Sequence, residues 1–283
     1  MPNSADELLR ITRSDAVVDE SKGLLAVRSQ RLMNEPGIRH AFSTRKGGVS
    51  KPPFDSLNLG TSRNEPMENI LENYRLFSDA FGFSYEKLAL VRHEHGAKIL
   101  KIDRKDIGRG VYREPFDFCD GLITNDPGVT LVTCHADCSA FFMYDRRNRA
   151  IGLAHAGWKG MFARIGQRLA ESMRDEFGSE PSELICAVGP CICEKCFQVD
   201  KILGLSFAEE FDCSDIMKED PNDPGKGFVS LHAAAVVQLK DAGVSPENIS
   251  LMRLCTLEEK ELFYSYRRDG KDTGSMAAFL TLV

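Results

Sequence analysis

The stretch VTCHADCSAFFMYD, residues 132–145, joins the apolar pattern of a buried β-strand to four reactive side chains, those of Cys134, His135, Asp137 and Cys138. Burying an Asp and a His without partners costs folding free energy, so their presence here points to a specific use. Strict alternation places His135 and Asp137 on one face of the strand and the two thiols on the other. Asp137 and Cys138 can therefore share a pocket only where this strand bends or ends.

Short apolar runs bounded by turn residues surround this stretch and predict further β-strands. They cover residues 38–44, 87–93, 97–102, 120–124, 129–135, 140–145, 150–155 and 183–189. Apolar residues at helical spacing, ended by glycine, predict helices over residues 66–82, 161–178 and 231–243, while the polar segments 103–117 and 212–227 are expected at the surface. Strands dominate the middle of the chain, so we expect an α+β fold, a single domain of mixed β-sheets flanked by helices.

Composition limits the class of protein further. The 283 residues carry a formal net charge of -6, with 42% hydrophobic residues and nine cysteines. The acidic balance argues against a nucleic acid or a membrane surface as partner, and no apolar run is long enough to span a bilayer. We expect a cytoplasmic protein with reduced thiols, a polar and frayed segment over residues 1–22, and a catalytic domain over residues 23–283. The sequence leaves the oligomeric state open.

The stretch AIGLAHAGWKG, residues 150–160, places a histidine where a buried strand is expected to end. Alternation puts His155 on the same face as Ile151 and Leu153, and Gly157 follows just before the long predicted helix. At such a position a strand can present its last side chain to a cleft. A lone histidine at a strand end is, however, more often a hydrogen-bonded structural residue.

A third stretch, LVRHEHGAKIL at residues 90–100, carries His93 and His95, which point the same way if the segment is extended. His95, Cys138 and His155 each lie near a predicted strand end, and they are far enough apart in sequence that only the fold could join them. Two imidazoles and one thiolate suit zinc, with a fourth position left open for water or substrate, and copper also accepts this set. Taken alone, Cys138 is more often a small core residue.

Seven sequence blocks occur in the order found in one known family. They are FSTRKGGVS (42–50), FDSLNLG (54–60), HEHG (93–96), CDGLITNDPGVTLVTCHADC (119–138), GLAHAGWKG (152–160), VGPCICEKCFQV (188–199) and FYSYRRDGKDTG (263–274). On these blocks the chain resembles the YfiH family, also called laccase-domain or polyphenol-oxidase-like proteins. The resemblance covers about residues 41–274 and implies a single domain of mixed sheets with flanking helices.

The resemblance also implies a site and an activity. The site is a zinc centre formed by His95, Cys138 and His155. The activity is that of a purine nucleoside phosphorylase, which cleaves adenosine, inosine and methylthioadenosine with phosphate and also deaminates adenosine, so the expected partners are a purine nucleoside and phosphate. His93 and His135 are two additional imidazoles beside this site, available to orient the ligands or to supply a fourth one.

Phosphorolysis requires an anion-binding group. Arg45 is the leading candidate, because a guanidinium grips phosphate oxygens and the N–H groups of Gly47 and Gly48 could approach an anion. Asn58 is a candidate hydrogen-bond partner of the substrate, and Arg267 would add positive charge near the site. The structural alternatives are a surface arginine beside a Gly-Gly turn, a turn-capping asparagine and an exposed arginine in a hairpin.

Asp137, Cys138 and His155 are the expected catalytic residues. In deamination Asp137 would move a proton, although it could instead orient His155 or a backbone turn. Trp158 could stack on a base, but a tryptophan in this position more often packs under the helix that follows. The cysteines of GPCICEKC, residues 189–196, contain one C-x-x-C pair without a second pair at finger spacing, so we interpret them as packing thiols.

Two other functions use the same residues. A cysteine hydrolase or amidase that edits peptidoglycan precursors would use Cys138 as nucleophile and His155 or His135 as base. A copper-dependent phenol oxidase or a non-catalytic metal-binding module is the other, although six histidines are few for a laccase. Metal analysis separates the first alternative from the zinc enzyme, because a thiolate bound to zinc is not free to attack.

Overall fold

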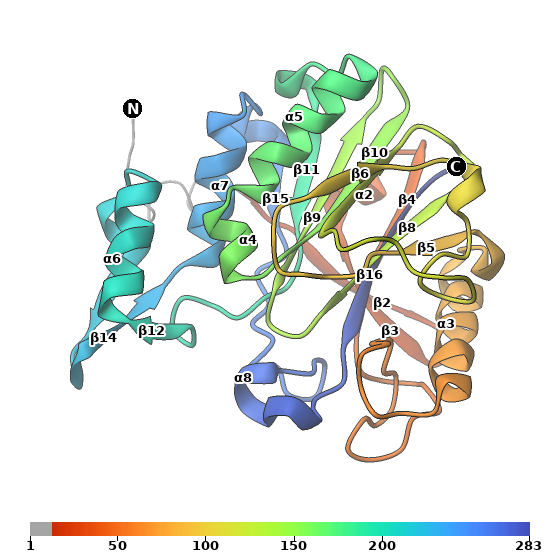
Figure 1. Cartoon of the computed structure of the whole chain (residues 1–283), viewed down its shortest axis with the longest axis horizontal. Helices are drawn as coiled ribbons and strands as arrows, with labels where there is room; N and C mark the ends of the chain where they lie inside the picture. Colours follow the sequence, from red (N-terminus) through yellow and green to blue (C-terminus); the bar gives the residue numbers. More distant parts are fainter. Residues whose placement is uncertain (1–12) are drawn as a thin grey trace.

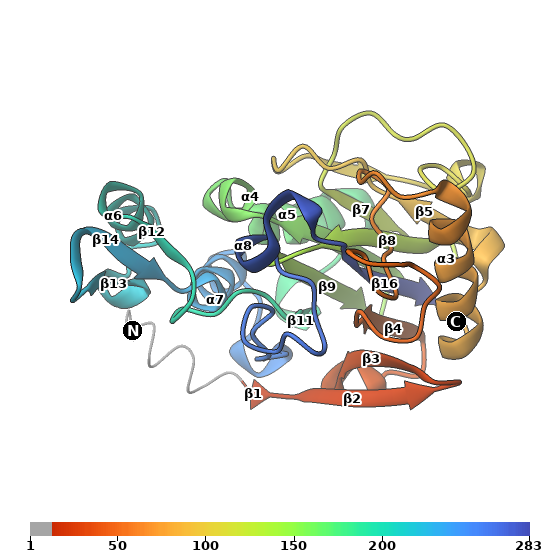
Figure 2. The ribbon, with the colours of Figure 1, turned by 90° about the horizontal axis from the view of Figure 1, so that it is seen from below.

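The computed structural model describes residues 13–283, and two mixed β-sheets face each other at its centre (Figures 1 and 2). The first sheet contains, in spatial order, β1 (Arg13–Ser14), β15 (Ile249–Leu251), β11 (Ile185–Val188), β9 (Ser139–Asp145), β10 (Ala150–Ala156), β7 (Gly121–Thr124) and β6 (Ile99–Lys101). The second contains β2 (Ala16–Ser21), β3 (Leu24–Ser29), β4 (Ile38–Ser43), β16 (Met276–Leu282), β8 (Thr130–His135) and β5 (Leu88–Leu90). The expected α+β fold with mixed sheets is confirmed.

Helices cover the outer face of each sheet. The first sheet packs against α4 (Trp158–Phe162), α5 (Ile165–Phe177) and α7 (Leu231–Asp241), and the second against α3 (Met67–Phe81). Leu169 and Met173 of α5 lie directly over Gly152 of β10, while Phe77 of α3 contacts Phe279 of β16. The order of layers is therefore helix, sheet, sheet, helix, and a separate apolar cluster fills each of the three spaces between them.

A small third sheet projects from the main body (Figure 1). It consists of β12 (Gln198–Asp200), β14 (Asp223–Val229) and β13 (Met217–Asp220), and α6 (Lys201–Glu210) packs on it. The remaining helical segments are α2 (Gln30–Met33), α8 (Tyr266–Asp269), η1 (Tyr85–Lys87), η2 (Arg104–Asp106), η3 (Pro181–Glu183), η4 (Ser214–Ile216), η5 (Pro246–Asn248) and η6 (Gly270–Asp272). The predicted surface segment 212–227 thus contains much of a β-hairpin.

The predicted strands all form, but two other expectations need correction. The helix expected over residues 161–178 is divided into α4 and α5, because Arg164 adopts a left-handed conformation with φ of 58°. The Arg164 guanidinium binds Glu210 and Asp241, which holds the break in place. The frayed segment was placed too far along the chain: Ala16–Ser21 pairs with β3 through its whole length, and residues 1–12 lie outside the described part.

The stretch 132–145 passes from one sheet to the other. It contains the end of β8 in the second sheet and β9 in the first, with Ala136, Asp137 and Cys138 between them. Asp137 has φ of 81°, the turn that ends the strand. The strand alternation is broken at this point, so Asp137 and Cys138 are both able to line one pocket. Across residues 13–283, no helix is long and apolar enough to cross a bilayer.

Candidate metal centre and pocket

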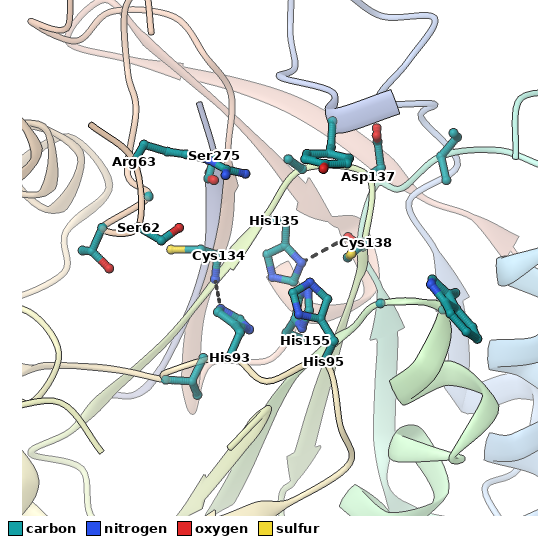
Figure 3. Close-up of a pocket in the computed structure, with 18 of the residues that line it drawn as sticks. Ser62, Arg63, His93, His95, Cys134, His135, Asp137, Cys138, His155 and Ser275 are labelled. Carbon is teal, nitrogen blue, oxygen red and sulfur yellow. Dashed lines mark hydrogen bonds between the residues drawn. The ribbon is translucent and has the colours of Figure 1, made fainter. Parts of the chain in front are cut away.

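A pocket of about 770 Å³ lies where the ends of β8 and β10 come together. Its walls include the β8–β9 turn, residues 60–63, and most of the segment between Leu90 and His95. The pocket is large enough for a small molecule such as a nucleoside. His93, His95, Cys138 and His155, together with His135, converge on its floor (Figure 3).

The three predicted metal ligands meet on this floor. One donor atom from each of His95, Cys138 and His155 lies within 4.8 Å of the others. His155 comes from the end of β10 and is buried, Cys138 comes from the β8–β9 turn, and His95 comes from the exposed loop before β6. That loop is not a strand, so the premise that His93 and His95 lie on one extended segment is wrong, although both line the pocket.

One buried carboxylate, that of Asp120, organises the two histidine ligands. Its Oδ1 atom lies 3.0 Å from Nδ1 of His155, and its two oxygens accept the backbone N–H groups of Glu94, His95 and Gly96. Burial by itself would raise the pKa of this carboxyl, but the hydrogen bond from His155, the nearby His93 ring at 3.6 Å and the Gly96 N–H outweigh burial and hold the pKa well below its usual range. Asp120 therefore stays ionised and fixes both the His155 ring and the backbone that carries His95.

The role of Asp120 was not predicted from the sequence, and the register of the sheet explains why. Ala154 of β10 pairs with Gly121 of β7, so the residues that follow and precede this pair, His155 and Asp120, are neighbours. The sequence shows a carboxylate at the first position of the buried strand predicted over residues 120–124, which is the signal that could have found it. Knowing that β7 pairs with β10, however, requires the fold.

The protonation states of the ligands favour metal binding over free-thiol chemistry. Burial, and then the neighbouring His93, lowers the pKa of His155 to about 3, so its imidazole is neutral and Nδ1 donates to Asp120. The nitrogen on the opposite side of the ring is then free to bind a metal. Burial, followed by the charges of Asp137 and Asp120, raises the pKa of the Cys138 thiol to about 12. Cys138 would lose its proton near neutral pH only beside a cation.

Gly157 shows that the space between the ligands is shaped for something small. A Cβ added at this position would lie 2.9 Å from the His95 ring, 3.3 Å from the Cys138 sulfur and 3.6 Å from the His155 ring. Any other residue would therefore clash with the His95 ring and crowd the Cys138 sulfur, while touching His155 at an ordinary contact distance. Two imidazoles and a thiol around such a space fit a single divalent transition-metal ion, zinc or copper.

His93 and His135 have other partners. Nε2 of His93 accepts the backbone N–H of Cys134, and its ring packs edge-on against the His155 ring, 4.1 Å between centroids. His135 uses both ring nitrogens, one with the Thr133 hydroxyl at 2.7 Å and one with the Cys138 carbonyl at 3.1 Å. Their contacts thus support and orient the ligands. A second donor group, formed by His93, Asp120 and His155, also lies within 4.8 Å, but hydrogen bonds already occupy most of its donors.

The carboxylate of Asp137 is enclosed by donors. Oδ1 accepts the Thr256 hydroxyl at 2.6 Å, and Oδ2 accepts the Ser265 hydroxyl at 3.0 Å and the backbone N–H of Arg267 at 2.7 Å. Asp137 therefore ties the β8–β9 turn to the segment that leads into α8. This arrangement matches the alternative in which Asp137 orients a backbone turn, while the carboxylate that orients His155 is Asp120.

Two predicted substrate contacts lie elsewhere. The guanidinium of Arg45 contacts the Asp55 carbonyl and the face of Tyr264, outside the pocket lining, and the Gly47 and Gly48 N–H groups are bound by Ser56. The reason is local: this loop folds back on itself, so its guanidinium and N–H groups form hydrogen bonds within the loop and are not available to an anion.

Asn58 is fully buried and its side chain binds Glu65 and the backbone N–H groups of Gly60 and Ser275. It therefore joins two loops and is not part of the pocket lining.

Three other arginines line the pocket. Arg267 does, as expected, but on the helical turn α8 in place of a hairpin, with its guanidinium bonded to the Gln198 carbonyl. Arg63 and Arg92 were not predicted. Within the described residues, Nε of Arg63 is buried and has no hydrogen-bond partner. Arg63 could not be found by spacing, because the segment that carries it reaches the site only through the tertiary fold.

Exposed aromatic rings form part of the pocket wall. Trp158 is 41% exposed and lines the pocket, so the expectation that it packs under the following helix is wrong. Phe118 and Tyr266 are also exposed and line it. Exposed rings beside a polar floor give a surface on which a flat heterocycle can stack.

Two facing mixed sheets with a His2Cys group at their end define an α+β domain with a candidate metal site. The particular family follows from comparison: the model described as multi-copper polyphenol oxidoreductase laccase matches residues 39–283, and the chain belongs to this family. The resemblance to YfiH proteins is also confirmed, since the crystal structure of YfiH from Bacillus licheniformis aligns with a TM-score of 0.85 at 27% identity, covering 94% of this chain and 99% of that chain.

Relatives in this family carry enzyme names. A purine nucleoside phosphorylase of Deinococcus radiodurans is 34% identical over 260 residues, covering 92% of this chain and 94% of the relative. The purine nucleoside phosphorylase YlmD of Bacillus subtilis is 31% identical over 254 residues, covering 89% and 91%. The crystal structure of YlmD from Geobacillus stearothermophilus aligns with a TM-score of 0.86 at 30% identity, covering 96% of this chain and 98% of that chain.

Proposed function

We propose that this protein is a zinc-dependent purine nucleoside phosphorylase that cleaves adenosine, inosine and methylthioadenosine with phosphate and deaminates adenosine as a side activity. The observation that carries the proposal is the convergence of His95, Cys138 and His155 on the floor of a pocket large enough for a nucleoside. The names of the relatives support the reaction class.

The three ligands leave room for substrate. A zinc ion held by His95, Cys138 and His155 would supply a Lewis acid at the pocket floor. The protein's own contribution is orientation: Asp120 holds the His155 ring and the His95 backbone, so both imidazoles are set before substrate arrives. His93 and His135 support this arrangement through hydrogen bonds to the Cys134 N–H, the Thr133 hydroxyl and the Cys138 carbonyl.

Phosphate would bind to the arginines of the pocket wall. Arg63 is the leading candidate in place of Arg45, because it lines the pocket and its Nε is a buried donor for which the described residues supply no acceptor. A phosphate oxygen would satisfy that donor, and Arg267 and Arg92 would add charge. The purine would stack on Trp158, Phe118 or Tyr266, whose side chains are partly exposed and line the same cavity.

Chromatography of the products from adenosine, inosine and methylthioadenosine, with and without phosphate, tests the reaction directly. We expect free base and the ribose phosphate only when phosphate is present, and inosine from adenosine whether or not it is present. Base release that does not depend on phosphate would identify a hydrolase and end the phosphorylase proposal. Absence of inosine would remove only the deaminase activity.

The environment of Cys138 disfavours the cysteine hydrolase alternative. The thiolate is the nucleophile, but burial and the charges of Asp137 and Asp120 raise the pKa of Cys138, while burial lowers the pKa of the neighbouring His155 to about 3, so His155 is a weak base for this thiol. The family description keeps a copper-dependent phenol oxidase as the other candidate. Oxidation of phenols by the copper-loaded protein, without turnover of nucleosides by the zinc-loaded protein, would favour it.

A further inference from the structure

A second group of metal-type donors lies outside the pocket. It comprises Cys193, Cys196, Cys255 and Glu258, whose donor atoms all lie within 4.8 Å of one another. We call it the thiol cluster. The two halves have the same spacing, C-x-x-C followed far along the chain by C-x-x-E, which is the spacing of paired zinc ligands. The sequence pattern alone is incomplete because a glutamate stands where a fourth cysteine would be recognised.

The fold joins the two halves through backbone pairing. Cys191 and Cys255 form an isolated parallel β-bridge, and the Thr256 N–H donates to the Cys191 carbonyl at 3.1 Å. The Cys193 N–H points at the Cys255 sulfur at 3.4 Å. These contacts fix the halves together before any ion is considered, so the four donors are organised by the backbone and are not a chance meeting of mobile side chains.

The carboxylate of Glu258 reaches both thiols of the first half. Its oxygens lie 3.6 Å from the Cys196 sulfur and 3.9 Å from the Cys193 sulfur. Ligands at 2.0–2.3 Å around a tetrahedral ion are separated by roughly 3.3–3.8 Å, so small movements would bring this set to coordination distance. The small cavity beside the cluster, about 210 Å³, is lined by Lys195 and Arg253 and also by the acidic Glu194 and Glu259.

We propose that the thiol cluster binds a structural zinc ion, distinct from the ion of the pocket. Three sulfur ligands and one carboxylate fill all four positions of zinc, which is the closed arrangement of structural sites, whereas the pocket group leaves one open. Soft thiolates select zinc over magnesium or calcium. The cluster contributes no group to the pocket, and its role is to hold chain segments together.

The segments that the ion would hold are those that fix the β8–β9 turn. Ile192, next to the first half of the cluster, donates its N–H to the Asp137 carbonyl at 3.0 Å. Thr256, next to the second half, donates its hydroxyl to the Asp137 carboxylate. An ion at the thiol cluster would therefore hold two of the partners of Asp137, the residue that precedes the pocket ligand Cys138.

Zinc content and thermal unfolding of the purified full-length chain test the inference. Atomic spectrometry should find two zinc ions per chain in the wild type, one in Cys138→Ala, and one in the double variant Cys193→Ser/Cys255→Ser. The double variant should also show a Tm lowered by roughly 5–10 °C, a larger decrease than in Cys138→Ala, because its ion holds distant chain segments together. Glu258→Gln should release zinc at a lower chelator concentration, while the control Glu247→Gln, at an exposed position outside the lining of this cavity, should match the wild type.

A second measurement keeps the inference open to refutation if the double variant does not fold. Alkylation of the wild type, read by mass spectrometry, should spare Cys193, Cys196 and Cys255 until zinc is chelated. Equal labelling before and after chelation, or a Cys193–Cys196 disulfide in zinc-loaded protein, would overturn it. A wild type with one zinc ion that Cys138→Ala removes would overturn it as well, whereas one zinc ion that survives Cys138→Ala would support it and count against the pocket centre.

Discussion

The pocket group and the thiol cluster are both sets of soft donors, yet their surroundings differ. The pocket group, His95, Cys138 and His155, opens onto about 770 Å³ of space and relies on one buried carboxylate for orientation. The thiol cluster has four donors and a cavity of about 210 Å³ beside it. An open group suits turnover and a closed one suits stability, so changes in the first should alter activity and changes in the second should alter unfolding.

The largest effect on activity is expected when a metal ligand of the pocket group is replaced, and this replacement tests the contrast most sharply. Cys138→Ala and His155→Ala should each lower kcat/KM for adenosine by on the order of a thousandfold or more, because the open position for substrate disappears with the ion. Circular dichroism and thermal unfolding should show a folded protein. Turnover near the wild-type rate in either variant would remove these residues from the site.

Asp120→Asn disturbs the pocket group without replacing any of the three metal ligands. The amide cannot match the charge that the carboxylate offers to His155 and to three backbone N–H groups, so zinc affinity should fall by about 10–100-fold. Competition with a fluorescent chelator measures the affinity. Asp117→Asn, an exposed aspartate three positions earlier, is the matched control and should bind zinc as the wild type does.

A smaller effect is expected for the anion-binding residues, and it distinguishes the wall of the pocket from its floor. Arg63→Gln should raise the KM for phosphate roughly tenfold and leave zinc content unchanged, because a charge-assisted hydrogen bond is lost. Arg45→Gln should leave that KM unchanged, since Arg45 contacts Asp55 and Tyr264 away from the pocket. Initial rates at varied phosphate concentration measure this KM. A raised KM for phosphate in Arg45→Gln alone would make Arg45 the phosphate-binding residue again.

The smallest effect is expected when a single methyl group is added at Gly157. Gly157→Ala should weaken zinc binding several-fold, because its Cβ would come within 2.9 Å of the His95 ring and close to both other ligands. Gly225→Ala, at an exposed glycine whose nearest new contact is the Asp223 carboxylate at 3.3 Å, is the control. Titration of both apoproteins with zinc gives the comparison, and equal affinities would mean that Gly157 does not shape the site.

The sequence predicted the strands, the α+β class and the three side chains of the pocket group. Apolar runs and glycine stops are local signals, so they remain valid whatever the tertiary fold. The helix division at Arg164 escaped prediction because it depends on ion pairs with Glu210 and Asp241, which lie far along the chain.

The parts of the site that sequence reasoning missed all depend on pairing between distant segments. Asp120 contacts His155 only because β7 and β10 are adjacent. The thiol cluster forms only because the backbone of Cys255 pairs with that of Cys191 in an isolated β-bridge. Arg45 was proposed from its Gly-Gly neighbour, which is visible in the sequence, and Arg63 was not, because exposure to a pocket is not visible there. Local chemistry thus identified the candidate ligands, but register and loop packing determined which charged residues surround them.

Anomalous diffraction at the zinc edge from crystals of the zinc-loaded protein tests the central claim most directly. We expect a peak on the pocket floor, about 2.3 Å from the Cys138 sulfur and about 2.0–2.1 Å from one ring nitrogen each of His95 and His155. A peak bound by His93 and Asp120 and away from Cys138, or no peak on the pocket floor, would contradict it.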